Sequence, residues 1–170
     1  LTAAGADCRT VRAGADGSFA AAELTSPRPA GVVVITAAAD GEPDAGCLAR
    51  GRELVGRVVR IARELSETDD TPPRLYVITR NAQHVTPHDR LNLDQGGVRG
   101  LLRVIGSEQP ALRPTQIDID ARTSSEDLVQ ELLSDSDEDE TAWREGEWLV
   151  ARLQQSPFRP EERRTSVADP

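Results

Sequence analysis

The sequence predicts an α/β fold in which a mostly parallel sheet is covered by helices on both faces. Two observations lead to this prediction: strand-like and helical segments alternate along the chain, and residues 74–120 form a complete strand, helix, strand pattern. A third is the segment Gly31 to Ala37 (GVVVITA), a strongly β-branched run typical of a buried strand. Helical connections of this kind join strands that run parallel.

The N-terminal part of the chain is predicted to form two strands and two helical segments. Ala6 to Arg12 is the first expected strand, Gly17 to Leu24 is a short helical turn, and the β-branched run is the second strand. The longest helix is expected between Ala45 and Ser66, with Asp44 as its N-cap, because apolar residues recur there three and four positions apart. These positions are Leu48, Leu54, Val55, Val58, Ile61, Ala62 and Leu65.

The central unit is predicted to begin with a buried strand at residues 75–78, directly after two prolines. A helix follows, and Pro110 ends it because proline lacks the backbone N–H that a helix needs. Residues 117–120 alternate isoleucine with aspartate, which is typical of a second strand. The apolar positions of the helix are Leu101, Leu102, Val104 and Ile105.

The C-terminal part is predicted to contain one more helix and a hairpin. Ser124 with Asp127 resembles a capping box at the start of a short helix. The acidic segment Ser134 to Glu140 is expected to be a solvated loop. Residues Ala142 to Leu153 contain two strand patterns around Glu145-Gly146, as in a β-hairpin.

The domain organisation follows from the element order and from a change in composition. Residues 157–170 are rich in proline and charge, so they are predicted to be a linker to a further domain. Residues 1–156 are predicted to be one domain, a Rossmann-like sheet with a C-terminal β-hairpin. Because methionine is absent, Leu1 is not expected to be a native start.

Composition restricts the classes of partner and the compartment. The 29 acidic and 20 basic residues give a net charge of −9, which argues against nucleic acid because binding to phosphate backbones needs clustered cations. Membrane insertion is not expected, since no apolar run approaches the roughly 18 residues that cross a bilayer. The two cysteines, Cys8 and Cys47, are predicted to be reduced and structural. We therefore expect a cytoplasmic protein.

A dinucleotide site would need a glycine-rich turn between the first strand and its helix. Residues 13–17 follow the first expected strand but lack the required glycine spacing. Gly96, Gly97 and Gly100 lie at or inside a helix, where we expect them to allow close helix packing. The sequence therefore predicts no cofactor-binding residues.

The residue combinations needed for catalysis or metal binding are incomplete. The chain has no lysine to assist its single tyrosine, Tyr76, which is predicted to pack in a buried strand. Ser107 lies inside a predicted helix and not in a nucleophile elbow. His84 and His88 are expected to be exposed in a loop that proline interrupts, without a third metal ligand.

The aspartates at positions 135, 137 and 139 imitate the start of a calcium-binding loop. The sixth position is Glu140 and the twelfth is Gly146, where such a loop needs glycine and glutamate, so a solvated loop is the preferred interpretation. Asp118 and Asp120 at a strand end are the best carboxylates for an alternative function, a small nucleotide-binding or oxidoreductase module. The preferred prediction is that catalytic, cofactor-binding and metal-binding residues are all absent.

Four segments resemble the structural subdomain of the ketoreductase region in type I reducing polyketide synthases. They are LYVITRNAQHV (75–85), GGVRGLLRVIGSEQPALRPTQIDID (96–120), WREGEWLVARL (143–153) and PFRPEERR (157–164). In that family a strand of the form LxVVTRxAQ precedes a helix with GLxRVIxxExP and a strand ending in IDxD. The resemblance extends from about Ala6 to Arg164 and is strongest to the mycobacterial, mycocerosic acid synthase-like group.

This resemblance implies a truncated, short-chain-reductase-like half that lacks a cofactor loop and a catalytic tetrad. It implies a non-catalytic role, packed against the catalytic ketoreductase half, with enoyl reductase and dehydratase domains in the same polypeptide. The tail Pro157 to Pro170 would lead into the enoyl reductase, and Leu1 to Gly5 resembles the end of a helix whose preceding strand is missing. The parent synthase, which builds methyl-branched fatty acids or polyketides, is expected to use NADPH and phosphopantetheine.

Overall fold

A computed structural model describes residues 1–12, 27–36, 45–67 and 71–155. Within these residues the chain forms a five-stranded sheet with the strand order β1-β2-β3-β4-β5. The first four strands pair in parallel, and β5 pairs antiparallel to β4. The predicted α/β class is therefore confirmed. The strands are β1 (Gly31–Ile35), β2 (Arg74–Arg80), β3 (Thr115–Ile119), β4 (Glu140–Arg144) and β5 (Glu147–Val150).

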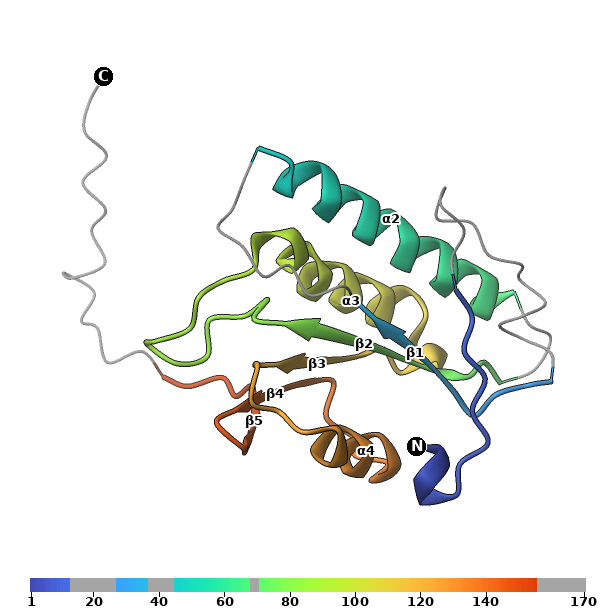
Figure 1. Cartoon of the computed structure of the whole chain (residues 1–170). Helices are drawn as coiled ribbons and strands as arrows, with labels where there is room; N and C mark the ends of the chain where they lie inside the picture. The colour runs from blue at the N-terminus through green and yellow to red at the C-terminus, as the bar shows by residue number, and fades with distance from the viewer. Residues whose placement is uncertain (13–26, 37–44, 68–70, 156–170) are drawn as a thin grey trace.

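Helices cover both faces of the sheet, as predicted. Helices α2 and α3 lie side by side on one face, and the shorter α4 lies on the opposite face (Figure 1). The helices are α2 (Cys47–Ser66), α3 (Gly97–Glu108) and α4 (Ser125–Leu133). Three short 3-10 turns complete the described elements: η1 (Thr2–Ala4), η2 (Leu93–Gln95) and η3 (Pro110–Leu112).

The alternation of side chains along the strands divides the core into two clusters. Leu75 and Val77 of β2 point to the α2 and α3 side, whereas Ile78 packs on the α4 side. The first cluster contains Val58, Ile61, Ala62, Leu65, Leu75, Val77, Val98, Leu102, Ile105 and Leu112. The second contains Ile78, Ile117, Ile119 and Trp143. Most residues of the predicted apolar stripes of α2 and α3 supply the larger cluster. Leu48 and Val104 were predicted in these stripes but are exposed.

The N-terminal strand prediction is wrong. Residues Ala6 to Arg12 form no strand, and their side chains are mostly exposed. The segment has too little apolar surface to be held in a buried ladder. Cys8 is exposed, so the prediction of a buried structural cysteine fails for this residue, whereas Cys47 lies at the start of α2 and is partly buried. The helical turn predicted at residues 17–24 lies outside the described residues.

Two of the predicted local signals agree with the structure, and one does not. Ser124 and Asp127 form both hydrogen bonds of a capping box at the start of α4. The β4–β5 hairpin turns at Glu145 and Gly146, whose φ angles of 53° and 83° match a two-residue hairpin turn with left-handed backbone. The N-cap of α2 is Gly46 and not the predicted Asp44, which lies outside the described residues.

The glycines of α3 confirm one predicted close contact and correct another. A Cβ atom on Gly97 would lie 3.2 Å from a methyl group of Val55 in α2, so the two helices approach closely there. A Cβ atom on Gly100 would meet no atom within 4 Å, so this glycine serves no helix packing. Within the described part of the chain, no helix has the length and apolar character to cross a membrane.

Candidate functional site

The loop between β2 and α3 closes the carboxyl edge of the sheet, the edge where Rossmann-like proteins bind ligands. The loop leaves β2 at Asn81, whose φ of 51° turns the chain sharply. The backbone N–H of Asn81 donates to the Ile119 carbonyl at 3.0 Å, and that of Asn92 donates back to the Asn81 carbonyl at 2.7 Å. These bonds hold both ends of the loop against the ends of β2 and β3 (Figure 1).

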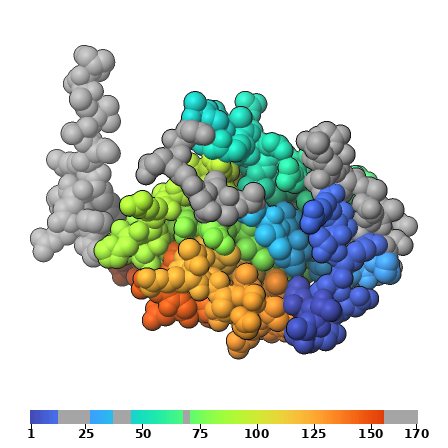
Figure 2. Space-filling model, in the orientation of Figure 1, coloured from blue at the N-terminus to red at the C-terminus, as the bar shows by residue number. Residues whose placement is uncertain are grey.

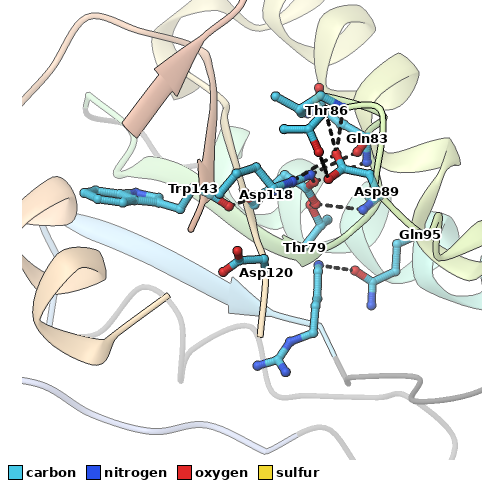
Figure 3. Close-up of polar contacts among 12 residues, drawn as sticks. Thr79, Gln83, Thr86, Asp89, Gln95, Asp118, Asp120 and Trp143 are labelled. Atoms are coloured by element: carbon cyan, nitrogen blue, oxygen red, sulfur yellow. Dashed lines mark hydrogen bonds and ion pairs between the residues drawn. The ribbon is translucent and has the colours of Figure 1, made fainter. Parts of the chain in front are cut away.

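Asp118 of β3 is the centre of a buried polar network at this edge (Figure 3). Its carboxylate accepts hydrogen bonds from the Thr79 hydroxyl at 2.6 Å and from the backbone N–H groups of Ala82 and Gln83 at 2.8 and 3.2 Å. It also accepts from Nη2 of Arg144 at 2.5 Å. Four donors from three segments therefore saturate a carboxylate that has no solvent exposure.

Arg144, the last residue of β4, connects this carboxylate to the loop. Its Nε donates to Asp89 at 3.0 Å, and its remaining nitrogens donate to the carbonyls of Asp118, Trp143 and Gln83. Burial lowers the pKa of the Arg144 guanidinium, but the hydrogen bonds and charges of Asp118 and Asp89 outweigh this and raise it above its ordinary value. A buried cation thus lies between two carboxylates.

Asp89 is the second carboxylate of the network and orders the loop itself. It accepts from the Val85 and Thr86 N–H groups at 2.7 and 3.0 Å and from the Thr86 hydroxyl at 2.6 Å. Burial raises the pKa of this carboxyl, but the hydrogen bonds from Thr86, Val85 and Arg144 outweigh burial and lower the pKa well below its ordinary value of 3.8. Asp89 is therefore ionised at neutral pH.

Asp120 lies just beyond β3 and belongs to a separate, half-buried cluster. It accepts hydrogen bonds from the N–H groups of Arg122 and Thr123, from the Thr123 hydroxyl, and from the N–H of Glu145 in the hairpin turn. Burial raises its pKa, but these donors lower it overall. Asp118 and Asp120 therefore share one strand end, as predicted, but bind different partners.

The network leaves little for chemistry at this edge, because its carboxylates are already engaged by donors of the chain. Gln95 is also engaged: its side-chain oxygen accepts from the Arg80 N–H at 2.7 Å and attaches η2 to the end of β2. Asp118 was predicted from the sequence as a candidate carboxylate, but its partners Asp89 and Arg144 were not. In the sequence, Asp89 and Arg144 stand out only by their charge, and charged residues on a protein surface look the same.

The other predicted side chains lie apart from one another. His84 and His88 are exposed in the loop, as predicted. Tyr76 is half-buried in β2, with the Arg74 guanidinium 4.8 Å from its ring centre. Ser107 is exposed on α3 and donates to the Arg103 carbonyl four residues earlier. Within the residues that the structure describes, no three side chains of histidine, cysteine, aspartate or glutamate are grouped to hold a metal ion.

A cavity of about 450 Å³ lies at the opposite, amino edge of the sheet, between α3 and the acidic loop before β4. Glu140 in its wall binds both Arg99 and Arg103 of α3. Burial raises the pKa of Glu140, but hydrogen bonds from these arginines outweigh it and lower the pKa. Asp135 and Asp137 are exposed and bind Arg113 across the same region. The predicted solvated loop is wrong at its last residue, because Glu140 is buried at the start of β4.

Comparison with known proteins decides the family. Over residues 2–153 the chain matches the family described as polyketide synthase extender module SpnB, Rossmann fold domain. The chain belongs to this family. The match to the SpnB-type Rossmann domain confirms the predicted fold and the predicted resemblance to polyketide synthases.

Several proteins similar to this chain are mycobacterial synthases. The chain is 55% identical over 147 residues, 86% of its length, to phthioceranic/hydroxyphthioceranic acid synthase of Mycobacterium tuberculosis. It is 55% identical over 139 residues, 82% of the chain, to a mycocerosic acid synthase-like polyketide synthase of the same species. A mycocerosic acid synthase-like polyketide synthase of Mycolicibacterium smegmatis is 50% identical over 152 residues, 87% of the chain. The chain spans 7% of the length of each relative.

Proposed function

We propose that this domain is a non-catalytic structural subdomain that scaffolds the catalytic ketoreductase half of a polyketide synthase during the synthesis of fatty acids or polyketides. One observation supports the proposal above others. At the carboxyl edge, where a catalytic Rossmann domain holds its cofactor, Asp118, Asp89 and Arg144 are bound to one another and to the loop.

A nicotinamide dinucleotide does not fit this edge well. A pyrophosphate needs free backbone N–H groups at a glycine-rich turn, but the N–H groups of Ala82 and Gln83 already donate to Asp118. The sequence between β1 and α2, residues 36–46, contains Gly41 and Gly46 at the spacing of the first and last glycines of the dinucleotide-binding fingerprint, but the position of its middle glycine is Pro43, so the fingerprint is incomplete. We therefore assign the NADPH and phosphopantetheine expected for the synthase to its other domains.

The size of the relatives supports a role inside a larger polypeptide. A chain that spans 7% of such synthases has many other domains as possible neighbours. We propose that its partners are the catalytic ketoreductase half and the adjacent enoyl reductase and dehydratase domains, with residues 157–170 as the connection onward, in the cytoplasm. A specific interface of ordinary size would bury about 1,600 Å².

Calorimetric titration of this domain with the catalytic ketoreductase half of the same synthase tests the scaffold role. We expect saturable binding with a negative heat-capacity change, because apolar surface is buried. An unrelated single-domain reductase is the control, and it should not bind this domain. Absence of binding to the cognate half would contradict the scaffold role.

A thermal-shift measurement with NADPH, NADH and flavins separates this role from the alternative, a nucleotide-binding module. A ligand that binds only the folded state raises the melting temperature, by several degrees when it is present at about 100 times its dissociation constant. We expect no shift with any of the three. A shift with NADPH that disappears in an Asp120→Asn variant would favour the nucleotide-binding alternative.

A further inference from the structure

Exposed aliphatic side chains gather at the carboxyl edge of the sheet. Three segments form this edge: the end of β1, the first turn of α2, and the loop between β2 and α3 with η2. More than half of the large apolar side chains that are exposed within the described residues lie on these segments. We call this set the carboxyl-edge patch, and it consists of Ile35, Leu48, Val85, Leu91 and Leu93. A concentration of exposed apolar surface on one edge is typical of a protein-binding surface.

The centre of the carboxyl-edge patch lies where α2 meets η2. Leu48 is in the first turn of α2 and is 71% exposed, and Leu93 is in η2 and is 55% exposed. The two elements are in contact: Arg50 pairs with Asp94 at 2.5 Å, and a Cβ atom on Gly51 would lie 3.1 Å from the Asp94 carbonyl oxygen. Leu48 and Leu93 therefore lie on two elements that contact each other.

The charges around the carboxyl-edge patch differ in sign from those of the chain as a whole. The chain carries a net charge of −9, but the exposed ionisable side chains of the loop between β2 and α3 are His84, His88 and Arg90. The two carboxylates between β2 and α3 are both paired with arginines, Asp89 with Arg144 and Asp94 with Arg50. The loop therefore offers an apolar surface with the cationic side chain of Arg90 at its border.

The buried polar network of Asp118, Asp89 and Arg144 orders the loop that carries part of the carboxyl-edge patch. Asp118 holds the backbone of Ala82 and Gln83, and Asp89 holds the next turn, so the loop is ordered before any partner arrives. A surface that is ordered in advance loses less conformational entropy on association. In the space-filling view the loop, in yellow-green, lies on the surface at one end of the molecule (Figure 2).

We propose that the carboxyl-edge patch is the surface on which the catalytic ketoreductase half docks. This inference rests on the proposed function and adds the contact surface and its chemistry: an apolar centre with an acidic border on the partner. The partner belongs to the same polypeptide, since the chain is 7% of its relatives' length. Such a connection supplies an effective concentration that for short linkers reaches about the millimolar range, so a patch of modest size suffices.

Serine substitutions at matched leucines test the surface. Leu93→Ser and Leu48→Ser change the patch, whereas Leu133→Ser, at the end of α4 on the opposite face, is the control because Leu133 is 51% exposed. In titrations with the catalytic half we expect each patch variant to bind at least about tenfold more weakly, as at a central interface residue. The control should stay within about twofold of the unsubstituted domain.

A charge substitution tests the border independently. Arg90→Glu should lower the association rate at low salt, and the difference should shrink at high salt because ions screen exposed charges. Circular dichroism and thermal melts check that every variant is folded. Hydrogen exchange in the intact synthase gives a second measurement, in which residues 81–93 should be more protected than in the isolated domain.

The outcomes separate the two proposals. Weaker binding by the patch variants, with the control unchanged, supports docking at the carboxyl edge. If the unsubstituted domain binds and the patch variants bind equally well, the docking surface is wrong while the scaffold role stands. If the unsubstituted domain does not bind the catalytic half at all, the scaffold role fails and the docking surface fails with it.

Discussion

Replacing Asp118 by asparagine should destabilise the domain more than any exposed charge substitution. The variant retains the shape of the side chain but removes the charge that balances Arg144. An asparagine oxygen can still accept from Thr79 and Ala82, but its NH₂ group would face the N–H donors of Gln83 and Arg144. Removing one partner of a buried ion pair costs about 3–5 kcal/mol, a large part of the 5–15 kcal/mol that stabilises a typical domain.

Urea denaturation at pH 7 measures this loss, with tryptophan fluorescence as the signal. The indoles of Trp143 and Trp148 are in β4 and β5 beside Arg144, so they report on the affected edge. The matched control is Glu53→Gln, which removes an exposed pair with Arg57 on α2 and should cost less than about 0.5 kcal/mol.

A loss for Asp118→Asn no greater than for the control would refute the reasoning. It would mean that the loop is held by its packing and backbone bonds and that the buried charges contribute little. The same result would also remove the physical basis for an ordered docking surface at the carboxyl edge.

Three further predictions concern stability. Because the folded state lowers the pKa of Asp89 below its ordinary value of 3.8, the ionised carboxylate stabilises the fold fully above pH 3.8. This stability is lost as the pH falls below 3.8 toward the folded pKa, so the urea midpoint of the unsubstituted domain should fall on acidification. The midpoint of Asp89→Asn should fall less steeply over the same pH range. Gly100→Ala should stabilise α3 by about 0.5–1 kcal/mol, whereas Gly97→Ala should gain less because its added methyl is crowded; equal gains in urea melts would contradict the packing assignment. Glu131→Gln should cost about 1–3 kcal/mol and alter tryptophan fluorescence, because this buried carboxylate accepts from the Trp143 indole; an unchanged spectrum would argue against the contact.

The elements with strong periodic patterns were predicted well from the sequence. The apolar stripe between Ala45 and Ser66 predicted α2, and the capping box at Ser124 and Asp127 predicted the start of α4. The hairpin at Glu145-Gly146 was also correct, because its turn chemistry is local. In each case the signal depends on residues only a few positions apart, so no knowledge of distant contacts was needed.

The errors arose where local pattern was weak. The segment from Ala6 to Arg12 alternates in character but has few large apolar side chains, and it forms no strand. The N-cap of α2 is Gly46, one residue before a helix whose stripe alone could not define its first turn. Weak alternation of apolar and polar residues is common in exposed segments. It therefore does not distinguish a strand paired in a sheet from an extended segment without strand partners.

The candidate site was predicted only in part. Asp118 was recognised as a carboxylate at a strand end, but its alternation with Ile117 and Ile119 suggested an ordinary polar face of a strand. The structure shows it fully buried and paired with Arg144, which lies 26 residues later. A buried aspartate and an exposed one look the same in a sequence until the partner that neutralises it is identified.

The sequence by itself determined the α/β class, the order of helices and strands from Gly31 onward, and the family of this domain. These follow from periodicity, capping and turn residues, which act over a few positions, and from motifs that are read along the chain. Only the tertiary structure decided how the carboxyl edge is filled. Asp89 and Arg144 are 55 residues apart and meet only because β2, β3 and β4 are neighbours in the sheet, and electrostatic pairing depends on that spatial order.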